Sequence, residues 1–143
     1  MAAIKRTGSA EWKGSVKEGK GTVSTQSGVL KASPYGFKTR FEGEAGTNPE
    51  ELIGAAHAGC FSMALSAKLG EAKLTPDRIA TTATVSLEKG EAGFSITAVH
   101  LDVTAKIPTA TEAQFQTIAQ DAKANCPVSK LLNTVITMTA KLE

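Results

Sequence analysis

Two cysteines are the residues of this 143-residue chain whose type suits nucleophilic or redox chemistry. Cys60 lies in an alanine- and glycine-rich segment, and Cys126 stands directly before a proline. A disulfide-stabilised secreted domain would carry more cysteines in a shorter chain, and a structural zinc site would pair its cysteines closely with histidines. Two widely separated thiols in helix-type sequence therefore favour reactive sulfur, with two small buried hydrophobic residues as the alternative interpretation.

A reactive cysteine needs a group that favours its thiolate. Cys60 falls about three turns inside a predicted helix, too deep for the N-terminal dipole to help much, so it needs a cation nearby. Arg40 is our candidate because it lies between Phe37 and Phe41 on a predicted strand, where a solvated arginine is the alternative. Cys126 lies at a predicted helix N-cap, so dipole reasoning alone makes it the more acidic thiol.

Glu50 is the predicted partner of that arginine, because a carboxylate can hold a guanidinium in a bidentate pose. The simpler interpretation is an acid that stabilises the start of a helix. Glu50 and Cys60 are separated by about 15 Å along one straight helix, so they cannot share a site within one chain. Antiparallel packing of two copies of this helix would bring Glu50 of one near Cys60 of the other, and we expect a homodimer.

His57 lies one turn before Cys60 and has the right type for the general base of a cysteine hydrolase or acyl transferase. The simpler interpretation is a helix histidine that makes a local hydrogen bond. His100 lies on the polar face of a predicted strand, where we expect it to be solvated.

The order of predicted elements is β-β-β-α-β-β-α-β, which indicates an α+β fold. Runs rich in Thr, Val and Phe between Gly, Ser and Pro residues predict strands, and Asn48 with Pro49 predicts the start of a long helix. Thr111 and Gln114 have the spacing of a capping box for a second helix. The predicted strands are 4–13, 21–27, 37–42, 79–88, 94–107 and 134–142, and the predicted helices are 48–70 and 111–125, with a helical turn at 126–132.

The long predicted helix contains an apolar stretch from Leu52 to Leu69 that approaches the length of a membrane span. Its Gly, Ala and Ser content, with one histidine and one lysine, favours a buried helix of a soluble protein. Gly54 and Gly59 each cost about 1 kcal/mol relative to alanine in a helix, which indicates that something packs unusually close. A sister helix is one candidate.

Composition predicts an ordered globular protein. Hydrophobic residues make up 41% of the chain and charged residues 21%, so disorder is not expected. A net charge of +2, scattered basic residues and few aromatic residues argue against nucleic-acid binding. We expect a single domain over residues 1–143, small enough for an oligomer to complete its core. A secretory signal pattern is absent, so we expect a reducing cytoplasm.

Several motifs resemble those of the OsmC/Ohr family of thiol peroxidases. They are NPEELIGAAHAGCFSMAL at 48–65 and NCPVS at 125–129, and the likeness covers nearly the whole chain. GKGTVST at 19–25 and YGFKTRFEG at 35–43 are similar to the osmotically inducible OsmC branch rather than the Ohr branch. The Gly-Gly-Arg motif of Ohr-like members is missing, so the choice of Arg40 rests on the OsmC-type segment.

The resemblance implies an intertwined α+β homodimer with two sites at its subunit interface. By position, Cys60 matches the peroxidatic thiol, Cys126 the resolving thiol, Glu50 the acid of the site and Arg40 its arginine. Organic hydroperoxides, in preference to hydrogen peroxide, would be reduced to alcohols through a Cys60 sulfenic acid and a Cys60–Cys126 disulfide. An external dithiol, of lipoyl type, would reset the pair, and the resemblance implies no metal or organic cofactor. From composition, we expect neither nucleic acid nor a membrane as a partner.

Two other classes of protein stay open on the sequence. A hydrolase or acyl transferase would need His57 within reach of Cys60 and would tolerate loss of Cys126. A non-catalytic binding module would leave both thiols inert.

Overall fold

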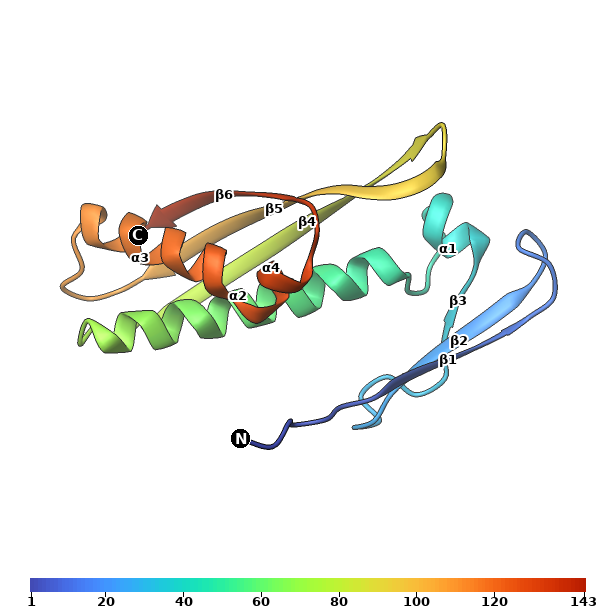
Figure 1. Cartoon of the computed structure of the whole chain (residues 1–143), viewed down its shortest axis with the longest axis horizontal. Coiled ribbons are helices and arrows are strands. Elements are labelled where there is room, and N and C mark those ends of the chain that lie inside the picture. The colour runs from blue at the N-terminus through green and yellow to red at the C-terminus, as the bar shows by residue number, and fades with distance from the viewer. The chain divides into compact units, whose positions relative to one another are not determined.

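A computed structural model describes all residues from 1 to 143 and divides them into two compact units, Met1–Pro49 and Glu50–Glu143 (Figure 1). The α+β class is confirmed, with the element order β-β-β-α-α-β-β-α-α-β once two short helices are included. The single domain over 1–143 stays a prediction.

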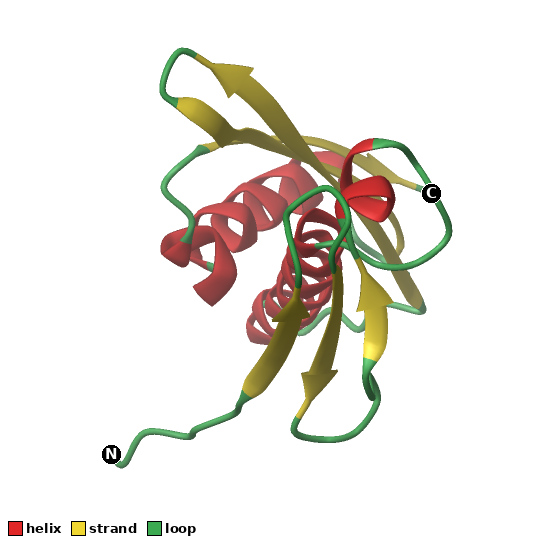
Figure 2. Cartoon of the chain, turned by 90° about the vertical axis from the view of Figure 1, so that its right-hand side faces the viewer, coloured by secondary structure: helices red, strands yellow, loops and turns green.

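The N-terminal unit is an antiparallel sheet of three strands in the order β1-β2-β3, followed by one helical turn (Figure 2). Its elements are β1 (Gly8–Lys13), β2 (Lys20–Thr25), β3 (Ser33–Tyr35) and α1 (Phe37–Phe41). The rings of Trp12 and Tyr35 pack at a tilt across this sheet with their centroids 5.4 Å apart. Gly21 lies between them, and a Cβ at this position would collide with both rings, so only glycine allows the approach.

The prediction of a strand over residues 37–42 is wrong, because Phe37–Phe41 forms helix α1 and the third strand comes earlier, at β3. The Gly36 backbone N–H donates to Thr39 Oγ1 at 2.8 Å, and the Arg40 N–H donates to the Gly36 carbonyl at 3.1 Å. The rings of Phe37 and Phe41 pack with centroids 4.9 Å apart, the i,i+4 pairing of a helix. These local contacts outweigh the strand preference of Phe and Thr.

The C-terminal unit packs helices on a three-stranded sheet in the order β4-β5-β6. β4 pairs antiparallel with β5, and β6 pairs parallel with β5 from Ala98↔Val135 to Ala105↔Leu142. The parallel pairing requires a crossover connection. The elements are α2 (Pro49–Glu71), β4 (Arg78–Gly90), β5 (Gly93–Lys106), α3 (Glu112–Asn125), α4 (Pro127–Leu131) and β6 (Val135–Leu142).

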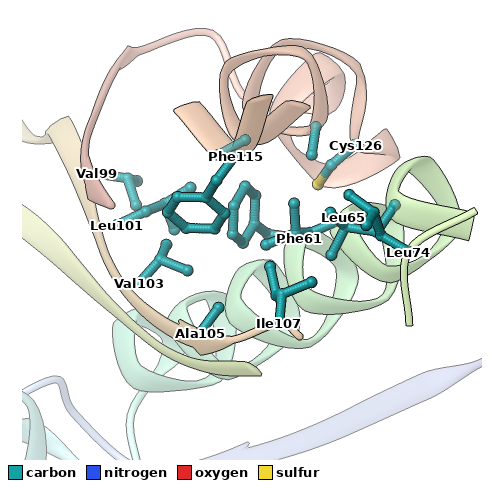
Figure 3. Close-up of a cluster of buried hydrophobic side chains, with 13 residues drawn as sticks. Phe61, Leu65, Leu74, Val99, Leu101, Val103, Ala105, Ile107, Phe115 and Cys126 are labelled. Atoms are coloured by element: carbon teal, nitrogen blue, oxygen red, sulfur yellow. The ribbon is translucent and has the colours of Figure 1, made fainter. Parts of the chain in front are cut away.

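The core of this unit lies between the sheet and helices α2 and α3, which cover the same face (Figure 1, Figure 2). Alternate residues of β5 from Val99 to Ala105 point inward, as the sequence pattern predicts, and Phe61 and Phe115 face them from the two helices (Figure 3). Thr111 caps α3 in the predicted capping box, since its side chain accepts from the Gln114 N–H at 3.2 Å. Cys126 belongs to the same core and lies near Leu65 (Figure 3).

One row of α2 faces the core and the opposite row does not. A Cβ at Gly54 would lie 3.1 Å from the Ala83 carbonyl, so the close neighbour of this glycine is β4 rather than a sister helix. A Cβ at Gly59 would have nothing within 4 Å. The exposed row, called here the open face of α2, consists of Ala55, Ala56, Gly59, Met63, Ser66 and Ala67.

Helix α2 is long and apolar enough to cross a membrane by length and composition alone, with a mean hydropathy of 1.3 in its most apolar 18-residue window. Phe61, Leu65 and Leu69 are nevertheless buried against the sheet, which is typical of the core helix of a soluble protein. Only 28% of the window is buried, because the open face of α2 packs on nothing within the C-terminal unit.

Candidate functional site

The two cysteines come together from segments that are far apart in sequence. Cys60 lies in the fourth turn of α2, and Cys126 lies at the junction of α3 and α4. Cys126 ends α3, since its N–H donates to the Ala122 carbonyl at 2.9 Å, and it also begins α4, where its Sγ accepts from the Ser129 N–H at 3.5 Å. Pro127 starts α4 because its missing N–H costs nothing at the first helical position.

The two thiols differ in how far solvent can reach them. Cys126 is 0% exposed within the core, whereas Cys60 is half-buried at its edge. The two side chains interact, since each shifts the pKa of the other, and both are free thiols in this structure. A small molecule from solvent can therefore meet Cys60 first, with Cys126 directly behind it.

The two thiols differ in acidity. Burial raises the pKa of the Cys60 thiol; the backbone N–H of Val128 offsets this only in part, and the Cys126 side chain adds to the rise. Burial also acts to raise the pKa of Cys126. The N–H and hydroxyl of Ser129, followed by the Cys60 thiol and the Val128 N–H, more than offset it and hold the pKa below its ordinary value. Cys126 is therefore the more acidic of the two thiols, and the causes are hydrogen bonds at the N-cap of α4.

His57 belongs to the row of α2 that faces the core. It is 0% exposed, and its Nε2 lies 2.7 Å from the hydroxyl of Ser129. Its Nδ1 is buried with no hydrogen-bond partner, and burial lowers the pKa of the ring. The predicted local hydrogen bond is wrong, because the partner is 72 residues away.

The hydrogen bonds of His57 also bear on the hydrolase interpretation. Neither ring nitrogen bonds to Cys60, because Nε2 is taken by Ser129 and Nδ1 has no partner. A Cys–His pair of the kind that a cysteine hydrolase uses is therefore not formed.

Ser129 is the site residue that sequence reasoning missed. Its backbone N–H and hydroxyl both lower the pKa of Cys126, and the hydroxyl also bonds to His57. The signal that could have found it is its position three residues after the N-cap of α4, where a backbone N–H reaches the capping side chain.

Arg40 lies on α1 rather than on a strand, so the predicted support for its side chain is wrong. Its guanidinium stacks on the Phe41 ring at 5.3 Å from the centroid. It lines a cavity of about 310 Å³ in the N-terminal unit together with Trp12, Val16, Tyr35, Gly36, Phe37 and Phe41.

Glu50 lies in the first turn of α2, and that helix is continuous through Cys60, as the spacing argument requires. Arg40 belongs to the N-terminal unit, and Glu50 belongs with the cysteines to the C-terminal unit. The roles of Arg40 and Glu50 at a shared site therefore stay predictions.

The remaining titratable groups form no metal site, since no three His, Cys, Asp or Glu side chains are placed to hold an ion. His100 lies on the polar face of β5 as predicted. It bonds to Thr137 and Thr139 of β6 instead of being simply solvated.

A half-exposed thiol in contact with a buried, more acidic thiol defines a protein suited to two-cysteine redox chemistry. Residues 41–141 match the family described as OsmC-like protein, and the chain belongs to this family. The predicted family is thereby confirmed.

The relatives agree with this assignment. Peroxiredoxin OsmC of Escherichia coli (strain K12) is 59% identical over 140 residues, which cover 98% of each chain. Among solved structures, OhrB of Bacillus subtilis superposes with a TM-score of 0.68 at 25% identity, covering 96% of this chain and 98% of its own. An organic hydroperoxide resistance protein from Elizabethkingia anophelis superposes with a TM-score of 0.73 at 26% identity over the whole of both chains.

Proposed function

We propose that this protein is a thiol-dependent peroxidase that reduces organic hydroperoxides to alcohols. The observation that carries the proposal is the contact between the half-buried Cys60 and the fully buried Cys126. The relative that shares 59% of its residues is called a peroxiredoxin, and two structural neighbours are called organic hydroperoxide resistance proteins. These names and the geometry favour the same chemistry.

The reaction begins at Cys60 because peroxide can reach it. Its thiolate attacks the terminal oxygen of the hydroperoxide, the O–O bond breaks, and the alkoxide leaves and takes a proton to become the alcohol. Cys60 is left as a sulfenic acid. Cys126 then attacks that sulfur, which forms the Cys60–Cys126 disulfide and releases water. An external dithiol, of lipoyl type in our proposal, reduces the disulfide and restores both thiols.

Cys60 needs help to become a thiolate, since burial raises its pKa. We assign this help to Arg40, whose permanent charge would favour the thiolate and the negative charge that develops on the leaving oxygen. Glu50 would hold the guanidinium in one orientation through a bidentate pair. The apolar and aromatic lining of the cavity beside Arg40 suits the organic part of a hydroperoxide.

The second copy in the proposed homodimer would cover the open face of α2. This face presents small side chains and Met63, which is 78% exposed, so two helices could approach closely there. Antiparallel packing would bring Glu50 of one copy toward Cys60 of the other. Cysteines that must return to the reduced state also fit the cytoplasmic location that we propose.

Intact-mass analysis tests the proposed reaction. Reduced protein treated with one equivalent of cumene hydroperoxide should lose two hydrogens as the disulfide forms. Cys126→Ser should gain oxygen instead, because its sulfenic acid has no resolving thiol, and the matched variant Cys60→Ser should keep its mass. An unchanged mass in the wild type would refute the peroxidase and leave the hydrolase or binding-module interpretation.

A further inference from the structure

Ser129 connects Cys126, the proposed resolving thiol, to His57, a buried group to which the peroxidase reaction gives no role. Its hydroxyl lies 2.7 Å from Nε2 of His57, and the same hydroxyl lowers the pKa of Cys126. His57 and Cys126 are both 0% exposed, and Ser129 is 7% exposed. His57, Ser129 and Cys126 therefore form a buried row, linked by the His57–Ser129 bond and by the Ser129 N–H that donates to Cys126, and this row ends on the resolving sulfur.

The direction of the hydrogen bonds follows from the two nitrogens of His57. A neutral imidazole carries one proton, and burial keeps this ring neutral by lowering its pKa. A buried N–H without an acceptor is rarer in proteins than an acceptor without a donor, so the proton belongs on Nε2, where Ser129 accepts it, and not on the unpartnered Nδ1. The Ser129 O–H is then free to donate to Cys126 Sγ.

We propose that Ser129, oriented by His57, is a positioning residue that donates a hydrogen bond to the Cys126 thiolate and so speeds closure of the Cys60–Cys126 disulfide. This inference rests on the proposed peroxidase function. The Ser129 N–H already caps Cys126 at 3.5 Å, and the hydroxyl adds a second donor from the same residue. Neither His57 nor Ser129 touches the peroxide in this scheme.

The step that they assist is balanced by the two cysteines alone. The Cys126 thiolate attacks the sulfur of the Cys60 sulfenic acid, the S–S bond forms, and the S–O bond breaks with its electron pair on oxygen. The departing hydroxide takes up the proton that Cys126 released and becomes water. Removing the hydroxyl of Ser129 should slow this step and leave the attack of Cys60 on peroxide unchanged.

Thiolate absorbance in a Cys60→Ser background tests the hydrogen bond without any peroxide. A hydrogen bond to a charged group contributes enough that Ser129→Ala should lower the thiolate fraction of Cys126 by about tenfold at a fixed pH below its midpoint. Ser129→Thr keeps the hydroxyl and should retain most of the fraction. His57→Leu should act like Ser129→Ala, and His57→Gln, which keeps an N–H donor, should restore part of the effect.

Rapid mixing with one equivalent of cumene hydroperoxide tests the consequence for the reaction. In Ser129→Ala, sulfenic acid should form at the wild-type rate and should persist for longer, with closure about tenfold slower and more dimedone adduct trapped. Unchanged titration and unchanged closure in Ser129→Ala would overturn the proposal, and circular dichroism of each variant identifies any loss of fold. If the wild type forms no sulfenic acid, the proposed function fails, while the titration still decides the hydrogen bond.

Discussion

Gly59 lies at the centre of the open face of α2, and its replacement by alanine tests whether a second copy covers that face. In the isolated chain an added Cβ would meet nothing within 4 Å. Glycine costs about 1 kcal/mol relative to alanine inside a helix, so Gly59→Ala should stabilise a monomer by about that amount. A thermal midpoint roughly 2–4 °C higher would accompany it.

If a partner helix lies in contact with Gly59, the same substitution should destabilise the protein instead of stabilising it. Forcing a methyl group into a packed interface costs about 1–3 kcal/mol, which exceeds or cancels the gain in helix propensity. We therefore expect Gly59→Ala to weaken the dimer by about tenfold or more in dissociation constant. Gly54→Ala is the matched control, because its Cβ would lie 3.1 Å from the Ala83 carbonyl of the same chain and should not change the dissociation constant.

Sedimentation equilibrium measures the dissociation constant, and urea unfolding at two protein concentrations measures stability. For the proposed dimer, the unfolding midpoint of the wild type rises with protein concentration. The main effect of Gly59→Ala should then be a higher dissociation constant. A variant that is about 1 kcal/mol more stable than the wild type at every concentration, with no change in mass, would refute a helix interface at the open face of α2.

Three further predictions concern the site and its supports. Arg40→Ala should raise the pKa of Cys60 and so slow its attack on peroxide by at least tenfold. Arg40→Lys keeps a positive charge and should recover part of the rate. Equal stopped-flow rates in the wild type and both variants would exclude a role for this cation. Burial lowers the pKa of His57, so as pH falls below about 6.5 the unfolded chain takes up this proton first and the free energy of unfolding in urea declines. His57→Gln should reduce that decline, and an equal decline in the wild type and the variant would contradict the assignment. Thr111→Ala should lower the free energy of unfolding in urea by about 1 kcal/mol, because it removes the side-chain cap of α3. Thr111→Ser keeps the hydroxyl, so an equal loss in that variant would show that the hydroxyl is not the cause.

The elements with strong local signals could be predicted from sequence. The alternation along β5, the proline start of α2 and the capping box of α3 each depend on neighbours within a few residues. Helix α1 could not be predicted, because Phe and Thr favour strands and its support is a bond between Gly36 and Thr39. The parallel pairing of β6 with β5 could not be predicted either, because the alternating pattern of β6 is compatible with any neighbouring strand.

The site also contains some features that could be predicted from the sequence and others that could not. Cys60 and Cys126 stand out by residue type, and the position of Cys126 before a proline predicts its cap. The bond between His57 and Ser129 joins residues 72 positions apart, so no local pattern contains it. The available signal was the spacing of His57 with Phe61 and Leu65 along one face of α2, which already placed the ring inward.

The order of elements along the chain governs when the two thiols can meet during synthesis. The connection between β5 and β6 carries α3, Cys126 and α4, whereas α2 with Cys60 and the β4–β5 hairpin precede it in the chain. A ribosome therefore releases Cys60 well before Cys126, and β6 can dock only after both. In an unfinished chain a sulfenic acid at Cys60 would have no resolving thiol, so only an external thiol could return it before further oxidation made the change irreversible.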